Sequence, residues 1–219
     1  MKIVCKVSAL LLLSSVTLLA LGYFYWYKPK TKITGKRFVP SPERNVAVDN
    51  SFLKKINRTA YELQSYCKAK NYNSTCCFMV DMSIPSGKQR FFVYNFKKDS
   101  VEIAGLVTHG SGSITAGDEL FFSNRPGSNC TSLGKYKIGN DYYGRFGLAY
   151  KLHGLDKSNN KAFERFVVLH AHSCVPANEV YPLPICPSLG CPTVSPAFLK
   201  KLKQYLDVPG KPILLYIYK

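Results

Sequence analysis

Several features are absent or scarce in this 219-residue sequence, and each absence narrows the choice of fold. No segment recurs with a period of roughly 20–50 residues, which excludes propellers and solenoids. The excess of Ala, Leu, Glu and Lys that is typical of helical bundles is also missing. The 15 glycines, 13 prolines, 15 tyrosines and 13 phenylalanines instead favour a turn-rich protein built mainly of β-strands. Hydrophobic residues at 46% and charged residues at 20% indicate a globular protein and exclude wholesale disorder.

Acidic residues are scarce as well. The 13 Asp and Glu residues stand against 30 Lys and Arg residues, which gives a net charge of +17. This excess favours anionic surroundings. The basic residues are scattered along the chain, and their densest group, from Lys28 to Arg37, directly follows a hydrophobic segment. The pattern indicates a membrane or cell-wall neighbourhood, or simply a solvated basic surface, and we expect no nucleic-acid partner.

That hydrophobic segment runs from Val7 to Tyr27, after two lysines near the N-terminus. Its first part has the length of a signal-peptide core, and Ala20–Gly22 offers a small-x-small cleavage site. The whole run, about 20 residues, is also long enough to span a bilayer. Residues 1–27 are therefore either a cleaved signal peptide or a membrane anchor, and both alternatives make the membrane a partner of this segment.

The basic group and the cysteines give opposite predictions of the side of the membrane on which the folded domain lies. The basic group after the apolar run would stay in the cytoplasm under the positive-inside rule. All of the eight cysteines except Cys5 lie beyond the run, as in an exported, oxidised domain that contains disulfides. We give the cysteines more weight and expect an exported protein, in the periplasm or on the extracytoplasmic face of the cell membrane.

Beyond the apolar run, residues 28–50 are basic and contain two prolines, which is typical of a tether, and residues 51–219 form the folded domain. Helical spacing predicts a helix over 52–68 with Ser51 as its N-cap, and a second helix after Ser195, where Pro196 takes the first helical position. Alternating or continuous apolar patterns predict strands at 78–82, 90–96, 101–108, 148–152, 166–170 and 212–218.

Few motifs that carry chemistry are present. The sequence has four histidines, no CxxC, no paired carboxylates near a histidine and no phosphate loop ending in GK[ST]. The informative segment runs from His170 to Cys191. Residues two apart in a strand face the same side, so His170 and His172 are expected to share a face, and Cys191 follows in the turn Ser188–Pro192.

This pattern suits nucleophilic catalysis by cysteine. A free thiol is only slightly ionised at neutral pH, and a neighbouring imidazole can take its proton. Gly190 would let a substrate approach closely, and backbone N–H groups of the turn could hold an oxyanion.

Two other arrangements of the same residues stay open. Cys191 could be disulfide-bonded, for example to Cys186 or Cys174, with both histidines as ordinary core residues; six paired cysteines out of seven would leave one thiol free. A wall-binding protein without catalysis, in which Cys191 is oxidised or unreactive, is a separate alternative. His170, His172 and Cys174 could instead hold zinc on one strand face, with water as the fourth ligand of a hydrolase.

Ordered motifs cover residues 75–219: an upstream His109-Gly110, then His170-Ala171, and finally Ser188–Pro192. Between and before them lie Phe91–Tyr94, Phe122–Asn124, Ser132–Tyr136, Tyr143-Gly144, Leu152–Asp156 and Arg165–Leu169. In this order the motifs resemble the murein L,D-transpeptidase (YkuD-like) catalytic domain, and most closely a variant subfamily with an upstream His-Gly and a Gly-Cys-Pro ending.

The resemblance implies a mainly β fold, the L,D-transpeptidase β-sandwich or barrel with a few peripheral helices. It implies Cys191 as nucleophile, His170 in preference to His172 as base, and Gly190 and Ser188 as supports of an oxyanion. The substrate would be a peptidoglycan stem peptide, which releases D-Ala and forms a thioester. An amine or water would then resolve the thioester, giving a cross-link or a trimmed stem. We expect no cofactor and no metal.

The sequence departs from the family pattern at two places. Leu189 replaces the histidine of the family's Ser-His-Gly-Cys box, so any role of that histidine is lost, and Pro192-Thr193 replaces the usual continuation. His109 and Gly110 match the subfamily's own motif and are candidates for the substrate site, although His109 could equally be a buried structural histidine.

Overall fold

The structure is a computed structural model that describes residues 17–21, 23, 50–117 and 119–219. The chain divides into two compact units, 1–48 and 49–219. In the first unit, residues 17–21 are helical and exposed. The predicted signal peptide or anchor at 1–27 and the predicted tether at 28–50 lie almost wholly outside the described residues. Among the residues that are described, no helix is both long and apolar enough to cross a membrane.

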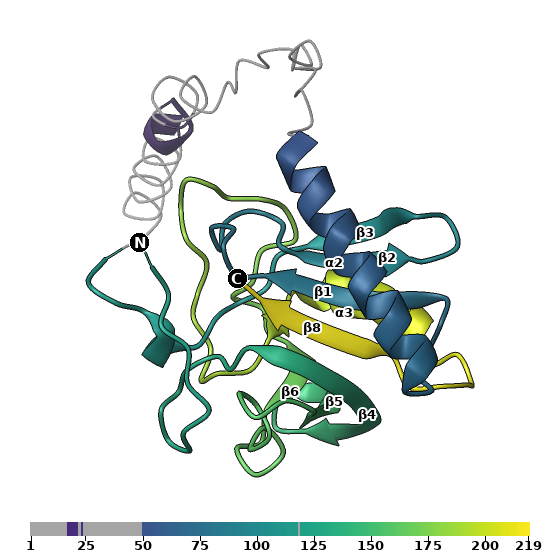
Figure 1. Cartoon of the computed structure of the whole chain (residues 1–219). Helices are drawn as coiled ribbons and strands as arrows, with labels where there is room; N and C mark the ends of the chain where they lie inside the picture. Colours follow the sequence, from purple (N-terminus) through teal and green to yellow (C-terminus); the bar gives the residue numbers. More distant parts are fainter. Residues whose placement is uncertain (1–16, 22, 24–49, 118) are drawn as a thin grey trace, which may run out of the picture. The chain divides into compact units, whose positions relative to one another are not determined.

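The second unit is built on one eight-stranded sheet, with strand order β3-β2-β1-β8-β4-β5-β6-β7 (Figure 1). Neighbouring strands are antiparallel except in the pairs β1–β8 and β6–β7, which are parallel. The strands are β1 (Cys76–Asp81), β2 (Phe91–Asn95), β3 (Ser100–Gly105), β4 (Gly134–Gly144), β5 (Gly147–Gly154), β6 (Val168–Ala171), β7 (Thr193–Val194) and β8 (Leu214–Tyr218). Beside them are the helices α2 (Asn50–Ala69) and α3 (Pro196–Leu206) and a short 3-10 helix, η3 (Ser111–Ser113).

Helix α2 lies across β1, β2 and β8 (Figure 1). Its buried residues recur at helical spacing, as Ile56, Ala60, Leu63 and Cys67, because one face of the helix packs on the sheet. The predicted helix over 52–68 is confirmed. The helix begins at Asn50, so Ser51 lies inside it and the prediction of Ser51 as N-cap is wrong.

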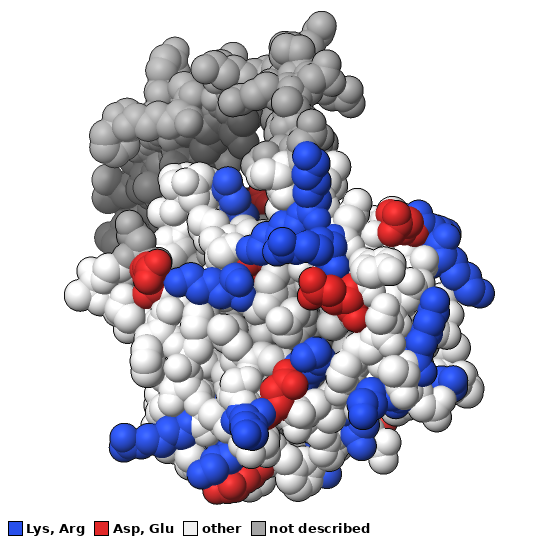
Figure 2. All heavy atoms as spheres, in the orientation of Figure 1, with Lys and Arg blue, Asp and Glu red and all other residues white. Residues whose placement is uncertain are grey.

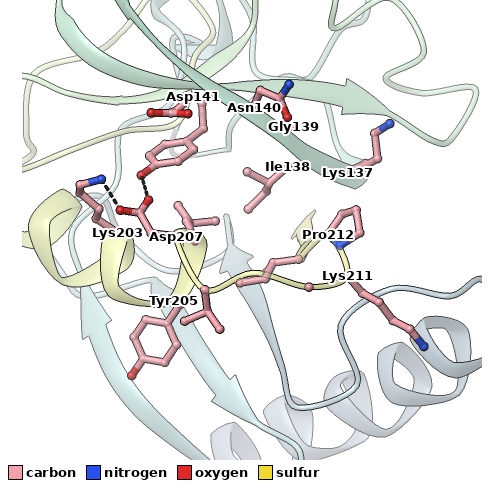
Figure 3. A pocket seen from close by; sticks show the side chains of 15 residues that line it. Lys137, Ile138, Gly139, Asn140, Asp141, Lys203, Tyr205, Asp207, Lys211 and Pro212 are labelled. Carbon is pink, nitrogen blue, oxygen red and sulfur yellow. Dashed lines mark hydrogen bonds and ion pairs between the residues drawn. The ribbon is translucent and has the colours of Figure 1, made fainter.

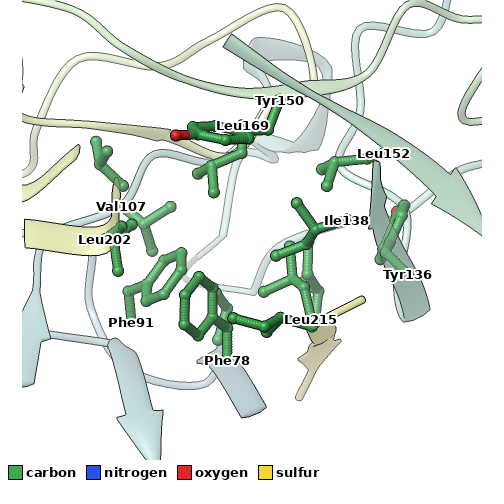
Figure 4. Close-up of a cluster of buried hydrophobic side chains, with 14 of the residues drawn as sticks. Phe78, Phe91, Val107, Tyr136, Ile138, Tyr150, Leu152, Leu169, Leu202 and Leu215 are labelled. Carbon is green, nitrogen blue, oxygen red and sulfur yellow. The ribbon is translucent and has the colours of Figure 1, made fainter. Parts of the chain in front are cut away.

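The main core lies on the opposite face of these strands, where the sheet curls over itself. Side chains of β5 and β6, including Tyr150 and Leu169, face Phe78 and Phe91 from β1 and β2 across this core (Figure 4). Helix α3 closes the core at one side with Phe198, Leu199 and Leu202. The mainly β fold with a few peripheral helices is thus confirmed.

The N-terminus of α3 has the predicted cap. The Ser195 hydroxyl accepts a hydrogen bond from the Phe198 N–H at 3.2 Å, and Pro196 follows as the first helical residue. The cap fixes the direction of the chain directly after β7, the strand that begins two residues after Cys191.

The predicted strands correspond to β1, β2, β3, β5, β6 and β8, with shifted ends. The prediction over 101–108 is too long, because β3 ends at Gly105, which packs against the Phe198 ring. The longest strand, β4, is not predicted from the local pattern. It contains three glycines with Asn140 and Asp141, residues that are depleted in strands, and its pairing with β5 shifts register between Ile138 and Asp141.

Candidate active site

The candidate residues lie at one edge of the sheet, on strand β6 and in the turn that precedes strand β7. Strands β6 and β7 are parallel, and His170 pairs with Thr193. The turn that contains Cys191 leads directly into β7. Gly190 has a φ of +112°, and a Cβ atom there would come within 2.8 Å of the Cys130 carbonyl oxygen. Only glycine fits this turn without strain, and its backbone geometry sets the position of Cys191.

Hydroxyl groups hold the main chain of the turn in place. The Ser188 hydroxyl donates to the Cys191 carbonyl oxygen at 2.6 Å, and the Thr108 hydroxyl donates to the same oxygen at 3.1 Å. The Gly190 N–H, a candidate oxyanion donor, donates to Ser188 Oγ at 3.1 Å. Ser188 therefore braces the turn, and Gly190 would have to exchange this partner in order to bind an oxyanion.

The sulfur of Cys191 is half-buried at the wall of a pocket of about 330 Å³. The Val168 N–H lies 3.5 Å from the sulfur, which in turn lies 3.7 Å from the Phe166 carbonyl oxygen. Burial raises the pKa of the Cys191 thiol, while the Val168 N–H and the positive charge of Arg165 lower it. The resting thiol is therefore protonated at neutral pH and needs a base before it can attack a carbonyl carbon.

The ring of His170 lines the same pocket and is 6% exposed. Its Nδ1 lies 3.1 Å from the Ala171 carbonyl oxygen, which can only accept, so Nδ1 carries the proton of the neutral ring. Nε2 is then the basic nitrogen, and it lies 3.0 Å from Thr193 Oγ1. Burial lowers the pKa of His170, which keeps the ring neutral and able to accept a proton.

An aromatic side chain covers this histidine. Phe146, between β4 and β5, stacks on the His170 ring with centroids 4.9 Å apart and an interplanar angle of 24°. It also meets His172 edge-on at 6.1 Å. The exposed His172 accepts the Cys174 N–H through Nδ1 at 3.1 Å. The stacking restrains His170, whereas His172 remains at the solvent side of the pocket.

The structure brings Cys191, His170, His172 and Ser188 together around one pocket, with Leu189 beside them, 73% exposed. It does not bring the ring of His109 there. The main chain of His109-Gly110 runs alongside Ser188, whose N–H donates to the His109 carbonyl oxygen at 2.8 Å. The His109 ring itself lines a different pocket.

The disulfide that the structure contains argues against two alternatives, a disulfide of Cys191 and a zinc site. Cys174 and Cys186 form a disulfide with each other, so the alternative that pairs Cys191 with either of them is wrong. The same bond removes Cys174 as a thiolate ligand, so the zinc site with His170 and His172 has no support. The cysteines that the structure describes as free are Cys67, Cys76, Cys77, Cys130 and Cys191.

A further cavity, of about 480 Å³, lies between β4, the end of α3 and residues 208–213 (Figure 3). Lys203 and Asp207 form an ion pair there, and the Tyr150 hydroxyl donates to the same carboxylate at 3.1 Å. The residues described around this cavity include no cysteine and no histidine. It therefore has no nucleophile of the kind found in the first pocket.

Sequence reasoning missed two side chains that contact His170. Thr193 could have been found from alternation, since it lies two residues after Cys191, on the same side of an extended segment. Phe146 carries no comparable signal, because its place depends on how β4 and β5 pair and on how the sheet curls.

With this geometry described, the chain can be compared with known proteins. The family model for the L,D-transpeptidase catalytic domain matches residues 48–218. The chain therefore belongs to the L,D-transpeptidase catalytic-domain family, as the motif order suggested. No curated protein matches the sequence.

The solved structures that match this chain share little sequence with it. The avibactam carbamoyl enzyme called Ldtfm is 13% identical, with 66% of this chain and 49% of that chain covered and a TM-score of 0.41. The helical cell shape determining protein Pgp2 from Campylobacter jejuni is 13% identical, with 65% and 47% covered and a TM-score of 0.40. An L,D-transpeptidase from Xylanimonas cellulosilytica is 14% identical, with 70% and 68% covered and a TM-score of 0.35. This chain thus spans about half the length of the first two.

Proposed function

We propose that this chain is a cysteine acyltransferase that acts on peptidoglycan stem peptides and releases their terminal D-Ala. Membership of the L,D-transpeptidase family supports the reaction class. The observation that carries the proposal is that a free cysteine and a neutral, buried histidine line one pocket. These are the nucleophile and the base that acyl transfer through a thioester requires.

The first half of the proposed reaction forms the acyl-enzyme. His170 Nε2 exchanges the Thr193 hydroxyl for the thiol proton of Cys191, and the sulfur attacks the carbonyl carbon of the bond to D-Ala. As the tetrahedral intermediate collapses, the C–N bond breaks and the imidazolium returns its proton to the departing D-Ala amine. Backbone N–H groups of the turn, among them Gly190 after it leaves Ser188, stabilise the oxyanion. The products are free D-Ala and a thioester on Cys191.

The second half regenerates the thiol. An amine of a neighbouring stem, or water, attacks the thioester carbonyl carbon, and His170 takes a proton from this nucleophile. The C–S bond then breaks, and the sulfur leaves and is reprotonated. An amine gives a cross-linked product and water gives a trimmed stem, so the same residues support transpeptidase and carboxypeptidase activity.

The surface and the N-terminal segment agree with a cell-wall substrate. Lys and Arg side chains outnumber Asp and Glu on the face shown in Figure 2, and they are spread over it and form no single track. Such a surface suits an anionic wall. The proposed substrate lies outside the cytoplasm, so the protein must be exported. The apolar run from Val7 to Tyr27 supports export and attachment to the membrane.

The proposal is tested with the purified chain and disaccharide-tetrapeptide muropeptides, analysed by mass spectrometry. We expect loss of D-Ala, with or without dimers, and a decrease of about 10⁴-fold or more in Cys191→Ala. Cys67→Ala, which removes another free thiol, should remain active, and a chelator should have no effect. Turnover that persists in Cys191→Ala would overturn the proposal, and no turnover by the folded wild type would leave a wall-binding role.

A further inference from the structure

A second pocket, of about 590 Å³, lies on the other side of the segment that supports the nucleophile turn. His109 and Arg90 line it together with Ile84, Tyr181 and Leu183. It shares no lining residue with the pocket of Cys191. Its wall combines apolar side chains with polar groups, and the polar groups decide what it can bind and how the ligand is oriented.

The buried charge beside this pocket is positive. Arg90 is 1% exposed, and its N–H groups donate to the carbonyl oxygens of Ile84 and Val107. The acid that acts on its charge is Asp81, which also pairs with Lys55 at 2.8 Å and accepts from the Ser83 hydroxyl. One carboxylate thus serves two cations. Buried charges are normally paired, so this site has capacity for one more negative charge.

His109 presents a donor to the same pocket. Arg90 Nη2 lies 3.0 Å from His109 Nδ1, and because a guanidinium can only donate, Nδ1 accepts and Nε2 carries the proton. Burial and the neighbouring Arg90 lower the pKa of His109 to about 4, so the ring stays neutral and keeps this tautomer near neutral pH. The Nε2–H group is therefore free of competition from Arg90 and fits an oxygen acceptor.

The two pockets adjoin through one short segment. Thr108 lines the pocket of Cys191 and His109 lines the second pocket, as expected for neighbours in an extended segment. Gly110 bridges to Ser188, and the loop that ends there begins at the disulfide cysteine Cys174. We infer that an extended peptide, which advances about 3.3 Å per residue, runs along this segment from one pocket to the other.

We propose that this second pocket is a subsite for a carboxylate of the stem peptide, bound by the His109 Nε2–H over the buried charge of Arg90. The inference rests on the proposed function for the identity of the peptide. It assigns to the His109-Gly110 motif a binding role at a distance from the sulfur. Binding energy gained at such a remote group holds the peptide in place for attack.

The test measures equilibrium binding to the full chain carrying Cys191→Ala, which separates binding from turnover. The probes are the tetrapeptide and its forms with each carboxylate amidated in turn. One amidated form should bind about tenfold more weakly or worse, the loss expected for a hydrogen bond to a charged group. His109→Leu should weaken the free tetrapeptide equally and make that amidation harmless. His109→Gln, which keeps a donor and an acceptor, should retain most of the affinity.

His153→Leu is the matched control, because this histidine stacks on Phe163 and does not line the second pocket. It should bind like the parent. If His109→Leu does not fold, the amidated peptides still test the subsite in the parent protein. The NMR resonance of the His109 Nε2–H group should then shift with the free tetrapeptide and not with the critical amidated form. Equal affinity of all amidated forms, or no shift of that resonance, would overturn the subsite. Failure of the wild type to release D-Ala would overturn the proposed function alone, since these affinities do not depend on turnover.

Discussion

Two groups of free cysteines lie in very different surroundings in this protein. Cys191 is half-buried at a pocket wall, next to an N–H group and within the influence of Arg165. Cys67 and Cys77 lie where α2 packs on the start of β1, Cys76 faces the main core from the same strand, and all three are buried. Burial raises the pKa of Cys67 to about 12 and that of Cys76 to about 11.

Access to a cavity and a neighbouring base, and not acidity, make a thiol of this protein available for chemistry. The pKa is raised at both places, so an unusually acidic thiol does not distinguish Cys191. What distinguishes it is access to a cavity and the presence of a base, His170, on the same wall. Cys67, Cys76 and Cys77 pack as small hydrophobic side chains, and the ionisable groups that raise their pKa values further are one another and Glu102.

The largest expected contrast is in alkylation by iodoacetamide. Cys67 and Cys77 can react only when the structure opens, and a typical opening free energy of about 5 kcal/mol corresponds to a factor of about 5 × 10³. We therefore expect Cys191 to react about 10³-fold faster than these two in the native protein. Peptide mass spectrometry after timed quenching measures the rates, and all free thiols should react after denaturation.

The pH dependence of the same alkylation tests whether Cys191 rests as a neutral thiol. Burial raises the pKa of Cys191 above its ordinary value of 9.0, so its alkylation rate should keep rising with pH beyond that value. A rate that is already constant at neutral pH would indicate a stable thiolate–imidazolium pair. That result would contradict the neutral pair described above.

The next largest effect concerns the base. His170→Gln keeps an amide that can bond to Ala171 and Thr193 but removes the basic nitrogen, so the rate of D-Ala release should fall about 10³-fold. His172→Gln should change it at most several-fold, because that ring is exposed and its hydrogen bond among the described residues is to the Cys174 N–H. Muropeptide kinetics measure both variants. The reverse ranking would exchange the roles of the two histidines.

The parts of the fold and site that could be predicted are those specified by sequence patterns within one element or one connection. The hairpin of β1 and β2 follows from alternation, and the Ser195 cap from local residue types, so the sequence predicts both. Cys191 and His170 were paired by motif order. His170 lies on β6, and Cys191 lies in the turn that leads into β7, the parallel partner of β6. These signals are local or depend on one connection.

The features that the sequence did not predict depend on how distant strands pair and on how the sheet curls. Strand β4 has a glycine-rich pattern and is held by its pairing with β8 and β5, which local propensity does not report. Phe146 reaches His170 only because that hairpin folds over the pocket. His109, although next to Thr108 in sequence, points into the other pocket because neighbours in an extended segment face opposite sides.

The smallest expected effect distinguishes positioning from proton transfer within the pocket. The Thr193 hydroxyl lies 3.0 Å from His170 Nε2, the nitrogen that must accept the thiol proton. Thr193→Val keeps the size of this buried side chain and removes the hydroxyl, so the ring loses one restraint. A lost hydrogen bond of about 1–1.5 kcal/mol corresponds to roughly a tenfold decrease in kcat, with KM nearly unchanged.

Thr193→Ser is the matched control, because it restores the hydroxyl and should recover most of kcat. The acid limb of the pH–rate profile gives an independent readout, since the hydroxyl that contacts Nε2 affects the proton affinity of His170. In the wild type this limb should lie below the ordinary imidazole value of 6.5, as burial lowers the pKa of His170, and in Thr193→Val it should move. Equal kcat values for valine, serine and threonine, with identical profiles, would show that Thr193 only pairs β7 with β6.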